Sequence, residues 1–202
     1  MARPERGYVM KSERVQAFTD GVIAIIITIT VLELPVPHRA DLGSLRGELP
    51  ILLAYALSFV NVGIYWNNHH HLFQATRHID GSVLWANLFM LFWMSLAPWV
   101  IRWLDESNFA PMPMAGFGFV FGMTAVGYIW MQTRIIAING PDSIIGRAVG
   151  SDLKGKASLA AYVAGAVLAF FVPWLSAALY TGIALVWLIP DRRIEHELKR
   201  EV

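Results

Sequence analysis

Residues 14–34 read RVQAFTDGVIAIIITITVLEL, a long apolar run that contains two acids, Asp20 and Glu33. The segment between these acids, Gly21–Leu32, has twelve uncharged residues and would extend about 18 Å as an α-helix. A charged side chain at the centre of a bilayer costs a few kcal/mol or more, so both acids must lie near the edges of the hydrocarbon or face protein and water. The run is therefore predicted to be a membrane-spanning helix with charge near both ends.

The composition of the whole chain agrees with a membrane protein. Of its 202 residues 56% are hydrophobic and 15% are charged, against about 45–50% and about 25% in soluble proteins. The net charge of +1 gives no field that would attract nucleic acid, and the lack of cysteine excludes a disulfide scaffold, a cysteine-ligated zinc site and a thiol nucleophile. We expect a single transmembrane domain over residues 1–190 and a short charged cytoplasmic tail over residues 191–202.

Six apolar stretches are candidates for membrane-spanning helices. They are Val15–Leu34, Leu49–Asn67, Ser82–Ile101, Met112–Gln132, Ala157–Phe171 and Trp174–Ile189. The last two are short and Pro173 lies between them, so they are predicted to form a helical hairpin; the alternative is one long helix that is kinked at this proline. The predicted fold class is thus an all-α membrane protein with six transmembrane helices in each subunit.

The lysines and arginines are distributed unevenly between alternate connecting segments. Thirteen of the 16 basic residues fall at the two ends of the chain and after the second and fourth stretches, and the other three are Arg39, Arg46 and Arg102. Cytoplasmic segments are enriched in basic residues, so this distribution places both termini in the cytoplasm. It also indicates an even number of spans and supports the hairpin.

One face of the first apolar stretch has the features of a pore lining. Ile25, Thr28, Ile29 and Leu32 recur at helical spacing. Large aliphatic side chains around a pore would form hydrophobic constrictions, the hydroxyl of Thr28 could solvate a partly dehydrated cation, and Glu33 would concentrate cations at the outer mouth. On periodicity alone, the simpler interpretation is that the isoleucines face lipid.

A polar cluster is expected at the cytoplasmic end of the second stretch, where residues 66–73 read WNNHHHLF. Adjacent histidines on a helix point about 100° apart, whereas zinc ligands usually lie three or four residues apart, so no metal site is expected. Arg14 and Asp20 belong at the same depth, and a hydrogen-bonded Arg–Asp–His–Asn network between the first two helices would explain the cluster. Asp20 would then be paired with Arg14 or with a histidine, and Asn87 in the third stretch should also find a polar partner.

The motif around Asp20 also matches a known pattern. The sequence Arg14-x-x-x-Phe18-Thr19-Asp20, with the run that follows it, closely resembles the first helix of the prokaryotic transmembrane-protein-175-like potassium channels, which have serine at the position of Thr19. Further residues that are similar to this family are Trp66, Asn67, His69, His70 and Asn87. The specific motifs lie in the first three stretches, and the last three match only in number and length.

The resemblance implies a homotetramer in the plasma membrane of a prokaryote, with four copies of the first helix around the pore. It implies potassium permeation without a carbonyl filter and without a cofactor. The hydrophobic layers would fall on Ile25, Ile29 and Leu32, and a permeant K⁺ would pass near Thr28. The motif residues of the first helix, with partners from the next two helices, would hold the pore helix in place. The expected partners are other copies of the chain, the lipid bilayer and monovalent cations.

Two further patterns concern the later helices. Residues 124–128 read TAVGY, like the carbonyl filter of ordinary potassium channels, but the closing glycine is absent and the sequence lies within a continuous span, so we reject a filter here. Small residues recur every four positions and mark close helix packing, within one subunit or between subunits. These residues are Gly118 and Gly122, and Ala157, Ala161, Gly165 and Ala169.

Other functional classes compete with a channel. A proton-coupled secondary transporter would use Asp20 and the histidines at 69–71; pseudo-symmetric halves with broken helices would favour it, and neither is evident in the sequence. A membrane enzyme would need a nucleophile and a base, and no such pair is evident. A packing protein that conducts nothing is the remaining alternative.

Overall fold

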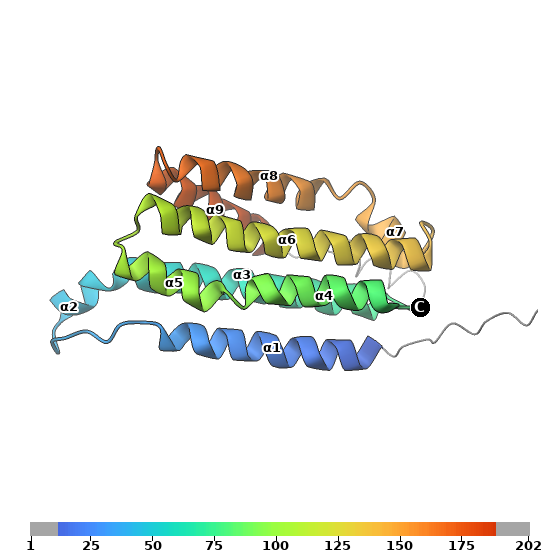
Figure 1. Cartoon of the computed structure of the whole chain (residues 1–202), viewed down its shortest axis with the longest axis horizontal. Helices are drawn as coiled ribbons and strands as arrows, with labels where there is room; N and C mark the ends of the chain where they lie inside the picture. Colours follow the sequence, from blue (N-terminus) through green and yellow to red (C-terminus); the bar gives the residue numbers. More distant parts are fainter. Residues whose placement is uncertain (1–11, 189–202) are drawn as a thin grey trace, which may run out of the picture.

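The computed structural model describes residues 12–188 and shows an all-helical bundle (Figure 1). Within these residues the helices are α1 (Ser12–Leu32), α2 (Leu42–Gly47), α3 (Leu49–Gln74), α4 (Gly81–Met94), α5 (Ala97–Glu106), α6 (Pro111–Asn139), α7 (Ile144–Val149), α8 (Leu153–Leu168) and α9 (Pro173–Leu188). The predictions for residues 1–11 and for the tail 191–202 lie outside the described residues.

The long helices lie side by side and alternate in direction along the chain (Figure 1). Helix α1 packs on α3, α4 and α5, whereas α8 and α9 pack on each other and on α6. Four segments are long and apolar enough to cross a membrane, namely Ser12–Leu32, Leu49–Gln74, Gly81–Glu106 and Pro111–Asn139, and Pro173–Leu188 is a shorter apolar helix. The start of α1 and the end of α9 face the same end of the bundle, as an even number of antiparallel segments requires.

The last two apolar stretches form the predicted hairpin and not a single kinked helix. Helix α9 begins at Pro173, where the missing N–H and the fixed backbone angle of proline suit a first helical position. The two helices pack against each other, because the Ser176 hydroxyl donates to the Gly165 carbonyl at 2.8 Å and the rings of Tyr162 and Tyr180 stack with centroids 5.9 Å apart.

The third apolar stretch is split into α4 and α5. Pro98 is the second residue of α5 and has no N–H to donate to the carbonyl of Met94, the last residue of α4, so the helix is interrupted between them. At its other end α4 is capped by Asp80, whose carboxylate accepts from the backbone N–H groups of Ser82 and Val83. The two helices together still form one segment long enough to span a bilayer.

Small residues allow the helices of one chain to approach closely. A Cβ at Gly127, the glycine of the TAVGY sequence, would lie 2.7 Å from the Cα of Met90, so α4 and α6 touch through their backbones there. Gly118 on α6 and Gly165 on α8 both face the ring of Tyr180 on α9. The glycines of the two small-residue stripes therefore serve contacts within one subunit, which the sequence had left open.

Candidate functional site

Helix α1 has two faces of different character. The buried residues are Thr19, Ile23, Ile26 and Thr30. On the opposite face the side chains of Ile25, Ile29 and Leu32 are 58%, 42% and 80% exposed. The predicted stripe is thus on one uncovered face of the helix, where large apolar side chains must meet lipid or another protein.

Thr28 lies on the same uncovered face, and its hydroxyl has a defined orientation. The hydroxyl donates to the carbonyl of Ile25 at 3.0 Å. Because its hydrogen is used within the helix, the oxygen offers only lone pairs to its surroundings, and lone pairs suit a cation. Phe18 is 53% exposed and continues this face toward the start of the helix.

A buried hydrogen-bond network joins α1 to its neighbours α3 and α4. The Asn87 amide donates to the Thr19 hydroxyl at 2.9 Å, and the Asn87 carbonyl oxygen lies 3.1 Å from Nε2 of His69. All three side chains are buried, and the His69 ring stacks on Phe73 with centroids 4.4 Å apart. Polar groups at this depth need internal partners, so the network holds α1 at one height and one rotation.

Asp20 has a different partner from those expected. Its carboxylate accepts from the indole N–H of Trp66 at 2.8 Å, so the predicted pairing with Arg14 or with a histidine is wrong. The reason is geometric: His69 points to Asn87, and His70 lies 2.8 Å from the Gln74 amide while its ring stacks with that of Trp66.

The remaining residues of the predicted network take little part in it. Arg14 is exposed, and its side chain has no hydrogen bond or ion pair to another residue within 12–188. Asn67 is half-buried and its side chain likewise has no hydrogen bond to another described residue. The single expected network is therefore two separate contacts, one from Asp20 to Trp66 and one that joins Thr19, Asn87 and His69.

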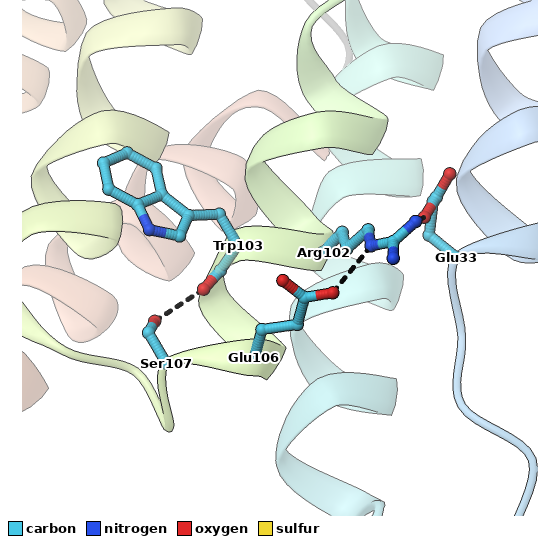
Figure 2. A network of polar contacts seen from close by, with 5 residues as sticks. All are labelled: Glu33, Arg102, Trp103, Glu106 and Ser107. Carbon is cyan, nitrogen blue, oxygen red and sulfur yellow. Dashed lines mark hydrogen bonds and ion pairs between the residues drawn. The ribbon is translucent and has the colours of Figure 1, made fainter.

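At the other end of α1, Glu33 forms an ion pair with Arg102 on α5 (Figure 2). Its carboxylate lies 3.6 Å from Nη1 of Arg102, and Nε of the same guanidinium donates to Glu106 at 2.8 Å. The sequence pattern predicted Glu33 as an acid at the outer mouth and did not indicate its pairing with Arg102. The available signal was that Arg102 lies at the end of the third stretch, on the same predicted side of the membrane, four residues before a glutamate.

These features define a class of protein. The chain is an all-α protein with several segments able to cross a membrane, and one of these segments is anchored by polar contacts on one face and carries an uncovered apolar face on the other.

Residues 14–98 match the family model described as "Endosomal/lysosomal potassium channel TMEM175". A potassium channel of Chryseobacterium sp. (strain P1-3) is 48% identical over 190 residues, which are 94% of this chain and 99% of that protein. The chain belongs to the TMEM175 family, which is an ion-channel family and not an enzyme family.

More distant relatives agree over shorter regions. A potassium channel of Streptomyces collinus is 37% identical over 100 residues, 48% of each chain. The human endosomal/lysosomal proton channel TMEM175 is 34% identical over 116 residues, 52% of this chain and 23% of that protein. The crystal structure of a lysosomal potassium-selective channel TMEM175 homolog from Chamaesiphon minutus superimposes with a TM-score of 0.76 at 23% identity, covering 89% of this chain and 97% of that one. This last comparison shows a shared fold.

Proposed function

We propose that the chain is a potassium-permeable channel of a prokaryotic plasma membrane, in which four copies of α1 line a central pore. Each subunit would cross the membrane six times and keep both termini in the cytoplasm. The observation that carries the proposal is the uncovered face of α1, on which Ile25, Thr28, Ile29 and Leu32 lie together while the opposite face is buried. One helix cannot enclose a pore, so the proposal requires self-association.

The anchoring of α1 supports a pore face over a face that meets only lipid. A pore lining requires the same residues to face the pore axis in every copy, and α1 is held at one rotation by the buried Thr19–Asn87–His69 network and by the bond from Trp66 to Asp20. These contacts determine which residues remain uncovered. The relative that matches 94% of the chain is named a potassium channel, and so is the Streptomyces relative that matches 48% of it, whereas the human relative that matches 52% is named a proton channel.

The arrangement suggests how ions would pass. Rings of Ile25, Ile29 and Leu32 would form a hydrophobic constriction, which resists ions by excluding water. Thr28 would place a ring of oxygen lone pairs between these layers, where a partly dehydrated K⁺ needs ligands. Asp20 accepts a hydrogen bond from Trp66, and His69 and His70 lie within hydrogen-bond distance of Asn87 and Gln74, so no hydrogen bond links Asp20 to these histidines as a proton-coupled transporter that uses both would suggest.

The proposal can be tested by cation flux into liposomes that contain the full-length protein. The comparison is between wild type, Ile25→Asn, and Leu185→Asn on α9 as a matched control, since both side chains are 58% exposed. Wild type should pass K⁺ in preference to Na⁺. Ile25→Asn should raise the flux and reduce the preference, because a carboxamide hydrates the constriction, whereas Leu185→Asn should change neither.

Three outcomes would contradict the proposal. The first is a wild-type flux no greater than that of empty liposomes at any pH or voltage. The second is an equal response to the two substitutions, which would remove α1 from the pore. The third is a flux that strictly requires a proton gradient, which would indicate a transporter.

A further inference from the structure

Arg102 lies between two carboxylates where α1 ends (Figure 2). Glu33 is the first residue after α1, and its carboxylate is 3.6 Å from Nη1 of Arg102; Glu106 lies one turn further along α5 and accepts from Nε at 2.8 Å. The guanidinium thus connects the end of α1 to α5. It binds Glu106 more closely than Glu33, so α5 holds the guanidinium in place and Glu33 lies against it.

The exposed fractions of these side chains show where the charge is accessible. The side chain of Glu33 is 25% exposed, whereas those of Arg102 and Glu106 are both 61% exposed. Glu33 follows directly after Leu32, which is 80% exposed at the end of the uncovered face of α1. Any cation that enters along this face therefore passes a carboxylate whose charge is partly compensated by a guanidinium that it shares with Glu106.

We propose that Arg102 is a positioning residue of the outer mouth: it holds the end of the pore helix against α5 and compensates the charge of Glu33, so that the mouth attracts cations less than free carboxylates would. This inference rests on the proposed function, because it takes α1 as the pore helix. It replaces the expected ring of free acids by a ring of Glu33–Arg102 pairs.

The effect of the Arg102 charge at position 33 can be measured even if the protein conducts no ions. The chain has no cysteine, so Glu33→Cys supplies a single thiol at the mouth, and Glu106 still holds Arg102 beside it. The measurement is the ratio of the rates at which an anionic and a cationic methanethiosulfonate reagent modify this thiol in the full-length protein at low ionic strength. A unit charge about 4 Å away contributes about 1 kcal/mol in water, with opposite signs for the two reagents, so adding Arg102→Gln should lower the ratio by roughly 30-fold.

The matched control is Arg39→Gln, which removes an arginine that pairs with Asp41 at 3.0 Å in the segment after α1. It makes the same change in net charge without touching the α1–α5 contact, and it should alter the ratio much less. A ratio that Arg102→Gln leaves unchanged, or that both substitutions lower equally, would overturn the inference. Each variant must elute at the wild-type oligomer size.

Potassium flux supplies the second test. At about 10 mM salt the Debye length is about 30 Å, and at about 1 M it is about 3 Å. Arg102→Gln should therefore raise K⁺ flux several-fold at low salt and leave it unchanged at high salt. The double variant Glu33→Gln with Arg102→Gln should lose this gain; a gain that persists would mean that Arg102 acts through its own charge and would refute the role of Glu33. If wild type conducts nothing, the proposed function fails, while the thiol measurement still decides whether Arg102 compensates the charge of Glu33.

Discussion

Replacing Asn87 by leucine should destabilise the protein by more than the loss of one hydrogen bond. Asn87 donates to Thr19 at 2.9 Å and lies 3.1 Å from the ring nitrogen of His69, so one substitution leaves two buried polar groups without this partner. Leucine has a similar volume, so the change in packing is small. The magnitude depends on whether each orphaned group can find another acceptor or donor.

The two orphaned groups differ in this respect. The Thr19 hydroxyl can turn to the carbonyl four residues earlier, as the Thr30 hydroxyl does with Ile26 at 2.7 Å. The ring of His69 is buried against Phe73 and has no such alternative. An unsatisfied buried group costs about 1–3 kcal/mol, whereas interhelical hydrogen bonds in membranes average about 0.6 kcal/mol. We therefore expect about 2 kcal/mol for Asn87→Leu and a smaller cost of about 1 kcal/mol for Thr19→Val, which leaves the buried Asn87 N–H without its acceptor but keeps the contact between Asn87 and His69.

The assay is the free energy of reversible unfolding of the full-length protein in mixed micelles. Asn67→Leu is the matched control, because Asn67 is half-buried on α3 and its side chain has no hydrogen bond to another described residue; it should stay within about 0.5 kcal/mol of wild type. The double variant of Thr19 and Asn87 should resemble Asn87→Leu alone. A cost for Asn87→Leu no greater than that of Thr19→Val would refute the assignment of the penalty to His69.

Two further predictions concern packing and pH. Gly127→Ala should lower the free energy of unfolding by about 1–3 kcal/mol, since the new Cβ would lie 2.7 Å from the backbone of Met90. The control is Gly63→Ala, whose Cβ would have no atom within 4 Å and which should be neutral or slightly stabilising. Equal unfolding free energies for the two variants would contradict a close contact between α4 and α6. The hydrogen bond from Ser82 lowers the pKa of the Asp80 carboxyl below its ordinary value, so ionised Asp80 stabilises the fold above about pH 4 and this contribution is lost as the pH falls through the lowered pKa. Asp80→Asn keeps a capping side chain and should flatten the acid side of a melting-temperature profile against pH; an unchanged profile would exclude Asp80 as a source of acid sensitivity.

Some features of the candidate site follow from local spacing. The stripe Ile25, Thr28, Ile29 and Leu32 follows from the helical repeat, and the structure leaves this stripe uncovered. The need of Asn87 for a partner follows from the cost of an unsatisfied amide in a membrane, and it has two partners in the structure.

Other features depend on how the helices are rotated against one another. Trp66 is 46 residues from Asp20, and whether it or a neighbouring histidine reaches the acid depends on a rotation of α3 by about 100° per residue. Arg102 meets Glu33 only because α5 packs against α1. Spacing along the chain contains no information about such contacts.

By itself, the sequence determined the class of this protein, an all-α membrane protein with its charges near the ends of the apolar runs. The physical reason is local: within hydrocarbon each apolar run must satisfy its backbone hydrogen bonds internally, and a helix does so without reference to the rest of the chain. Tertiary structure alone decided which face of α1 is covered, which side chains anchor it, and that Glu33 is paired with Arg102. Those outcomes depend on hydrogen bonds and ion pairs that form only within a few ångströms, so they exist only once the helices have packed.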